Sequence, residues 1–159
     1  MGEIEKLKKD ETATLIQILD DYDILMNLAF RALDEINSLK FHDMDLSSED
    51  EYEMMQLCEF HIHPAYLKLI EGVYANLILP ISYYQRIKGG AKLEGLDLYN
   101  RVEELKDTEY EYLSDNYNNV IRNAIAHGNV RYKQSDIIYE DKKGNSITLG
   151  SRDAVDYFD

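Results

Sequence analysis

Three polar side chains that could act on a phosphodiester lie close together in the stretch "IRNAIAHG", residues 121–128. Arg122 carries a planar fork of N–H donors that suits the oxygens of a phosphate. His127 can take up or release a proton near neutral pH, and the amide of Asn123 can orient either group or bind a phosphate. Together these residue types could activate a ribose 2′-hydroxyl and stabilise the charge that develops on phosphorus in the transition state.

The charge around this stretch differs from that of the whole chain. The 159 residues contain 31 acids and 17 Lys or Arg residues, a formal net charge of −14, yet residues 116–135 contain no Asp or Glu. A strongly acidic protein is a poor ligand for nucleic acid, because contacts to phosphate supply much of the affinity. The absence of acids here allows a phosphate to approach. Weaker RNA contacts are expected from the neighbouring residues Asn119, Arg131, Tyr132 and Lys133.

Amphipathic helices are predicted to position these residues. Apolar side chains recur at three- and four-residue steps over residues 3–36, which predicts one long helix. The same periodicity predicts further helices over residues 49–62, 64–88, 96–106 and 109–127. Ser48 and Glu51 have the spacing of a capping box at the start of the second of these helices.

Two prolines bear on the helix boundaries. The residue before Pro64 should leave helical geometry, so "HIHPAY" is expected to interrupt the chain between two helices. Pro80 is expected to kink a helix rather than end it, because the helical pattern continues until Gly89 and Gly90.

The helix predicted over residues 109–127 carries the candidate site. Thr108 and Glu111 have capping-box spacing at its start, and Gly128 is a favourable residue just beyond its end. Its apolar stripe is Val120, Ile121, Ala124 and Ile125, which should face the core.

Arg122 and His127 lie on different sides of such a helix. Five residues correspond to about 140° around a regular α-helix. The turn at Gly128 could redirect His127, or a second copy of the helix packed antiparallel could bring Arg122 of one chain near His127 of the other.

The last part of the chain has a different pattern. "DIIYE" and "SITLG" flank the turn sequence "DKKGN", which predicts a β-hairpin. The fold class expected is therefore an all-α bundle with a small C-terminal β-hairpin. The predicted organisation is a helical domain over residues 1–135, an appended hairpin over 136–150, and the start of a helix over 151–159 that leads into a further domain.

No metal or cofactor is expected. The stretch "CEFHIHP" holds Cys58, Glu59, His61 and His63, but on a helix His61 and His63 point to different sides. A structural role for these residues is therefore favoured over a metal site. The single cysteine and the lack of a signal sequence or membrane span indicate a cytoplasmic protein.

The stretch "IRNAIAHG" resembles the R-x4-6-H signature of the HEPN superfamily, the higher eukaryote and prokaryote nucleotide-binding domains. Arg122 and His127 match its two fixed positions, and Asn123 matches the polar residue that commonly follows the Arg. The resemblance implies an HEPN-like helical bundle and a metal-independent endoribonuclease. It also implies a homodimer whose two motifs form a composite cleft.

Many members of this family are toxins or antiviral-defence effectors, so the resemblance also implies an RNA substrate and an antitoxin or further domain as partner. The alternative is a non-catalytic HEPN-like module that binds nucleotide or RNA, or that dimerises within a larger protein. The strongly acidic composition favours this alternative.

Overall fold

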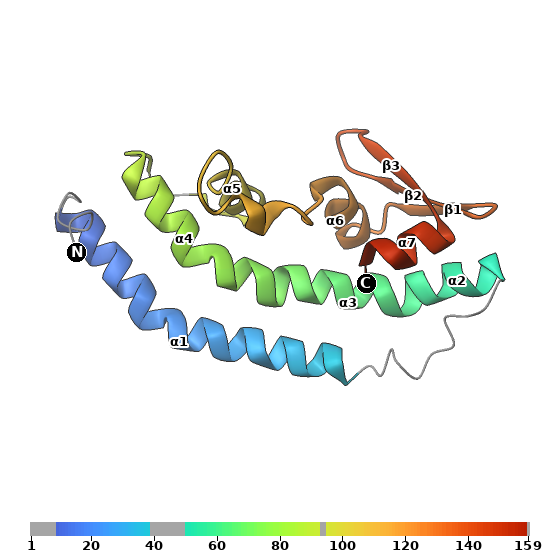
Figure 1. Ribbon diagram of the computed structural model, residues 1–159, viewed down its shortest axis with the longest axis horizontal. Coiled ribbons are helices and arrows are strands. Elements are labelled where there is room, and N and C mark those ends of the chain that lie inside the picture. The colour runs from blue at the N-terminus through green and yellow to red at the C-terminus, as the bar shows by residue number, and fades with distance from the viewer. Residues whose placement is uncertain (1–8, 39–49, 93–94, 159) are drawn as a thin grey trace. The chain divides into compact units, whose positions relative to one another are not determined.

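The computed structural model describes residues 9–38, 50–92 and 95–158, and it is mostly helical with a small antiparallel sheet near the C-terminus (Figure 1). The chain divides into two compact units. Unit 1 comprises the described residues of Met1–Arg31 and Glu71–Tyr117, and unit 2 those of Ala32–Ile70 and Asn118–Asp159. Each unit therefore combines two stretches that are distant in the sequence.

Helices account for most of the elements. In chain order the helical elements are α1 (Lys9–Asn37), α2 (Glu51–Leu57), the π-helical η3 (Cys58–Ile62), α3 (His63–Lys68), the π-helical η4 (Leu69–Tyr74), α4 (Ala75–Lys88), α5 (Leu98–Glu103), the 3-10 helix η5 (Glu111–Ser114), α6 (Asn119–Ala126) and α7 (Ser151–Phe158). The strands are β1 (Val130–Lys133), β2 (Asp136–Glu140) and β3 (Ser146–Gly150). Within the described ranges, no helix is both long and apolar enough to cross a bilayer.

The first two predicted helices are confirmed, with different boundaries. Helix α1 extends to Asn37, and residues 3–8 of the prediction lie outside the described ranges. Helix α2 begins at Glu51, where the carboxylate of Asp50 accepts a hydrogen bond from the Tyr52 N–H at 2.8 Å. Asp50 is thus the N-cap in the described structure, whereas the predicted cap Ser48 lies outside it.

The predicted interruption at Pro64 is wrong. His63 is helical (φ −58°, ψ −46°), and its N–H bonds to the carbonyl of Cys58, five residues earlier. This bond belongs to the π turn η3, which inserts one extra residue into the helical ladder. The shift in register accommodates the proline, which has no N–H and whose ring crowds the preceding turn of a regular helix. Helix α4 likewise continues through Pro80, as predicted, and ends before Gly89 and Gly90.

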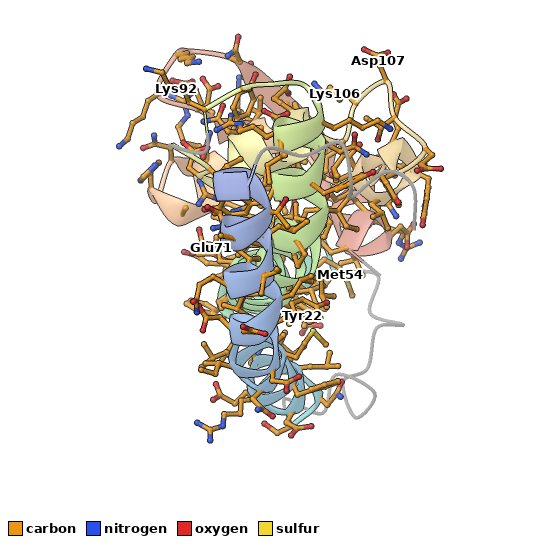
Figure 2. All side chains as sticks on the ribbon, turned by 90° about the vertical axis from the view of Figure 1, so that its left-hand side faces the viewer. Tyr22, Met54, Glu71, Lys92, Lys106 and Asp107 are labelled. Atoms are coloured by element: carbon orange, nitrogen blue, oxygen red, sulfur yellow. The ribbon has the colours of Figure 1, made fainter. Side chains whose placement is uncertain are left out.

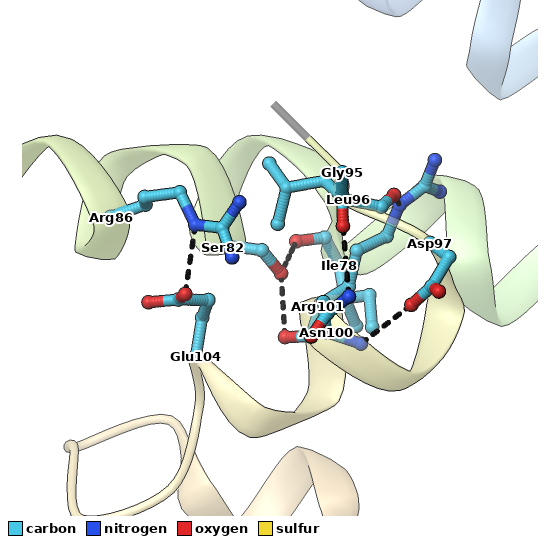
Figure 3. A network of polar contacts seen from close by, with 9 residues as sticks. All are labelled: Ile78, Ser82, Arg86, Gly95, Leu96, Asp97, Asn100, Arg101 and Glu104. Carbon is cyan, nitrogen blue, oxygen red and sulfur yellow. Dashed lines mark hydrogen bonds and ion pairs between the residues drawn. The ribbon is translucent and has the colours of Figure 1, made fainter. Parts of the chain in front are cut away.

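In unit 1, polar contacts attach α5 to α4 (Figure 3). The buried Oγ of Ser82 lies 2.9 Å from the carbonyl oxygens of both Ile78 and Arg101. Arg101 donates from Nη1 to the carbonyl of Ala75 and from Nε to that of Leu96, each at 2.8 Å. An ion pair of 2.8 Å between Arg86 and Glu104 adds a further link.

The prediction of one long helix over residues 109–127 is wrong. Thr108 Oγ1 does accept from the Tyr110 N–H, but only the short η5 follows. The α-helix starts at Asn119, because the side chain of Asn118 accepts hydrogen bonds from the N–H groups of Val120 and Ile121. Asp and Asn side chains compete for backbone hydrogen bonds in this way and disfavour helix interiors. The segment "SDNYNN" contains four such residues.

The predicted hairpin is confirmed, and a further strand extends it. Strands β2 and β3 pair antiparallel, and β1 pairs antiparallel with the other edge of β2 to give the order β1-β2-β3. The final segment is helical, as predicted, and forms α7. The core of unit 2 lies between the sheet and the helices, and its fully buried members are Cys58, Ile121, Ala124, Ile137, Tyr139 and Ala154.

Candidate functional site

Helix α6 attaches the candidate site to the core of unit 2. Of the predicted apolar stripe, Ile121 and Ala124 are buried in the core cluster, and Ile125 packs against it. The helix has only eight residues, so its side chains are fixed by this packing rather than by an extended helical framework. Its polar residues Asn119, Arg122 and Asn123 are half-buried, and the Nε of Arg122 is buried.

The C-terminal end of α6 is a Schellman motif. The N–H of Asn129 bonds to the carbonyl of Ala124 at 2.8 Å, and the N–H of Gly128 bonds to that of Ile125 at 3.2 Å. Gly128 has φ +67°, a conformation that glycine adopts without the strain of a β-carbon. His127 is the C-cap and is exposed, so its imidazole is accessible to a large substrate.

Arg122 and Asn123 contact each other directly. Arg122 Nη1 donates to Asn123 Oδ1 at 2.7 Å, and both side chains are partly buried. The carbonyl of Asn123 accepts a bond from the His127 N–H at 3.1 Å, so the backbone links His127 to this pair. The structure thus joins Arg122 and Asn123 through their side chains. It places His127 about one turn further along, at the C-cap of the same helix.

The residues proposed for weaker RNA contacts separate onto different surfaces. Arg131 and Lys133 are exposed on one face of β1, whereas Tyr132 points to the opposite face and packs against the core. The hydroxyl of Tyr132 is buried, and this burial raises its pKa. Asn119 is the first residue of α6 and not, as predicted, part of a longer helical face.

An acidic residue that the sequence reasoning missed lies beside Arg131. Glu140 of β2 forms an ion pair with Arg131, and its N–H bonds to the carbonyl of Asn129 at 3.2 Å. The segment 116–135 lacks acids in the sequence, but sheet pairing brings one to it. Recognising β1 as a strand would have predicted this, because antiparallel pairing then sets β2 alongside it.

The residues "CEFHIHP" divide between the core and the surface. His63 Nε2 lies 2.8 Å from the hydroxyl of Tyr139, and both side chains are buried. Burial raises the pKa of the Cys58 thiol to about 11 and lowers that of His63 to about 4, so both are neutral at pH 7. Glu59 and His61 are exposed. Among the described residues, no three His, Cys, Asp or Glu side chains are grouped to hold a metal ion.

The geometry of α6 provides a guanidinium, a neighbouring amide and, at the C-terminal end of the helix, an exposed imidazole. Comparison with protein-family models, curated proteins and solved structures found no match to this chain. What the site can do therefore follows from the chemistry of its own residues.

Proposed function

We propose that this protein is a metal-independent endoribonuclease of the HEPN type that acts as a homodimer. The observation that carries the proposal is the pairing of Arg122 with Asn123 on α6, one turn from the exposed His127. This arrangement lies in a segment whose own sequence has no acid between residues 116 and 135. Such a set of groups can bind a phosphodiester and move a proton without assistance from carboxylates.

Each residue has a defined role in the proposed reaction. His127 removes the proton of a ribose 2′-hydroxyl, and the resulting 2′-oxygen attacks the adjacent phosphorus. The bond from phosphorus to the 5′-oxygen breaks, and that oxygen takes up a proton, leaving a 2′,3′-cyclic phosphate and a 5′-hydroxyl end. Arg122 stabilises the charge on the phosphoryl oxygens, while Asn123 holds the guanidinium through its Oδ1.

The homodimer follows from the angular separation of the two charged residues. Arg122 and His127 are about 140° apart around a regular helix, and Asn123, to which Arg122 is hydrogen-bonded, lies between them. Two copies of α6 facing each other would combine Arg122 of one chain with His127 of the other. Each composite site would then need both chains.

Purified protein incubated with a mixed RNA pool in EDTA tests the activity. Wild type is expected to cleave and to leave 2′,3′-cyclic phosphate ends, whereas His127→Ala and Arg122→Ala are inactive but folded. His61→Ala is the matched control, because His61 is an exposed histidine of the same unit outside the proposed site. Equal cleavage by His127→Ala and wild type would remove His127 from the mechanism.

Mixing the two inactive variants tests the composite site. A heterodimer of His127→Ala with Arg122→Ala retains one site in which both residues are intact, so partial activity should return. Activity that stays absent in a mixture shown to contain heterodimers would mean that each site is built within one chain.

The biological setting we propose is that of a toxin or antiviral-defence effector, controlled by an antitoxin or a further domain. Induced expression of the wild-type chain in a bacterial host should arrest growth, and expression of His127→Ala to the same level should not. Growth arrest by both variants would separate the toxicity from cleavage.

A non-catalytic RNA- or nucleotide-binding module is the second candidate. The ion pair between Arg131 and Glu140 favours this second candidate, because Glu140 pairs with a guanidinium that a catalytic cleft would use to bind RNA. RNA binding that is measurable by wild type and His127→Ala alike, without any cleavage, would support this candidate over the nuclease.

A further inference from the structure

Helix α1 exposes a row of large apolar side chains. Within unit 1, Ile16 and Leu19 are each 53% exposed and Phe30 is 56% exposed. Together with Asp23 and Met26, these residues follow one another at alternating steps of three and four positions, which is the spacing of a coiled-coil seam. We call these five residues the α1 seam. Figure 2 shows the side chains of α1 on the blue ribbon, including the labelled Tyr22.

The seam borders the face that α1 already buries. Leu15 is buried about 40° around the helix from Leu19, and Ala29 is buried about 100° around it from Phe30. An apolar stripe that is wider than the buried part of a helix leaves apolar area for a further partner. Among the described residues, the α1 seam is therefore an exposed margin of the apolar face of this helix.

The acid at the centre of the seam selects the partner. Asp23 is the middle residue of the seam, seven residues from both Ile16 and Phe30. Two copies paired through it would therefore place Asp23 opposite Asp23 whether the helices ran parallel or antiparallel. Like charges brought together in a desolvated seam are unfavourable, which argues against a second copy of this chain.

The rest of α1 has the same sign of charge. Residues 9–37 contain seven acids (Asp10, Glu11, Asp20, Asp21, Asp23, Asp34 and Glu35) and two bases (Lys9 and Arg31). A partner helix with an apolar stripe and Lys or Arg residues beside it would cover the apolar row and pair with Asp20 and Asp23, which lie on that side of α1. A polar residue at a core position of a helix pair also fixes register, so a cation opposite Asp23 would set the alignment.

We propose that the α1 seam is a docking site for a basic amphipathic helix of another protein. The proposal is independent of the nuclease reaction, because its residues lie in unit 1 and the candidate site lies in unit 2. Ile16, Leu19, Met26 and Phe30 supply the apolar contact, and Asp23 supplies specificity for a cationic partner.

Binding of a designed peptide tests the proposal. The probe is a fluorescent helical peptide of about three heptads with Leu at the seam positions, except for a central Lys, and further Lys residues beside them. A second peptide has Glu in place of each Lys. Fluorescence anisotropy at physiological ionic strength should show saturable binding of the basic peptide to wild type and His127→Ala, and none of the acidic peptide.

Two matched variants locate the binding face. Leu19→Glu should weaken binding of the basic peptide at least about tenfold, because it places a charge among the apolar contacts. Leu28→Glu is the control, because Leu28 is 50% exposed on the same helix but lies about 180° around it from Leu19. This control should bind as wild type does. Asp23→Lys should reverse the preference, favouring the acidic peptide.

Three results would overturn the proposal. Equal weakening by Leu19→Glu and Leu28→Glu would show non-specific attraction to an acidic helix, and binding unaffected by Leu19→Glu would exclude the seam. The third is analytical ultracentrifugation in which Leu19→Glu converts a wild-type dimer into a monomer, because a second copy would then be the occupant. Circular dichroism of each variant confirms that α1 and the rest of the chain remain folded.

Discussion

His63 and Tyr139 are 76 residues apart in the sequence and are joined by a buried hydrogen bond of 2.8 Å between Nε2 and the hydroxyl. Their rings also meet edge to face, with centroids 5.4 Å apart. The contact links α3 to β2 inside unit 2, and the ring of Phe158 from α7 packs against both. Because the pair is buried and its histidine is neutral, the stability of unit 2 should depend on pH.

Acidification below neutral pH should destabilise the protein through His63. Burial lowers the pKa of His63 from 6.5 to about 4, so the unfolded chain takes up a proton more readily than the folded one. The stabilisation is complete above about pH 6.5 and is lost as the pH falls towards 4. Between pH 7 and pH 5 this one group should lower the free energy of unfolding by about 2 kcal/mol, measured by urea denaturation.

The variants His63→Gln and His61→Gln separate this effect from other titrations. His63→Gln should be less stable at pH 7 but should lose about 2 kcal/mol less than wild type on acidification. His61→Gln should follow wild type, because His61 is exposed. Parallel pH profiles for wild type and His63→Gln would contradict the assignment.

Cys58 should react with thiol reagents only after unfolding. Its side chain is fully buried, and burial raises the pKa of its thiol to about 11, so neither access nor thiolate is available in the folded state. Titration with a disulfide reagent at pH 8 should give almost no signal without denaturant and one equivalent in denaturant, since the chain has a single cysteine. Fast reaction of the folded protein would show that the core of unit 2 opens readily.

Gly128 should be sensitive to substitution for reasons of backbone conformation alone. Its φ is +67°, and a β-carbon placed there meets nothing within 4 Å, so the cost comes from the dihedral angle and not from a clash. Gly128→Ala should destabilise by about 1 kcal/mol, whereas Gly128→Asn should cost less because Asn tolerates this region. If the Schellman turn positions His127, cleavage should follow the same order. Equal stabilities would contradict the role of the turn.

Replacing Arg101 should weaken the attachment of α5 to α4. Its guanidinium satisfies the carbonyls of Ala75 and Leu96 at 2.8 Å each, and Arg101→Met would leave both without this donor. We expect a loss of about 2 kcal/mol and faster amide exchange in α5. Lys88→Met is the control, since Lys88 is exposed at the end of α4 and should change stability by less than about 0.5 kcal/mol. Similar losses in both variants would indicate that the network in Figure 3 contributes little.

Local patterns in the sequence were sufficient for elements whose cause is local. The three- and four-residue periodicity predicted α1, α4 and α5, and turn chemistry predicted the β2–β3 hairpin and the end of α6 at Gly128. Arg122, Asn123 and His127 were candidates from the sequence alone, because they lie in one short stretch, and their role stays a prediction. A periodic apolar face and a glycine turn act within a few residues, so they can be read directly.

Elements whose position depends on competing helix caps, or on strands elsewhere in the sequence, were predicted less well. The capping box at Thr108 was plausible by itself, but the Asn118 side chain offered a better start for a helix directly before the buried Ile121. Strand β1 was missed because the turn after it, at Gln134 and Ser135, lacks the glycine or asparagine that marks most tight hairpins; Gln134 adopts φ +56° there.

The sequence by itself determined that the chain is mostly helical, that it has a C-terminal hairpin, and which residues could act on a phosphodiester. Only the tertiary structure decided that Glu140 lies against Arg131, that Tyr132 faces the core, and that His63 is buried on Tyr139 rather than exposed. These relationships join residues that are 9 and 76 positions apart or depend on which sheet face is covered. Such contacts arise from the packing of whole elements, and no pattern within a few residues encodes them.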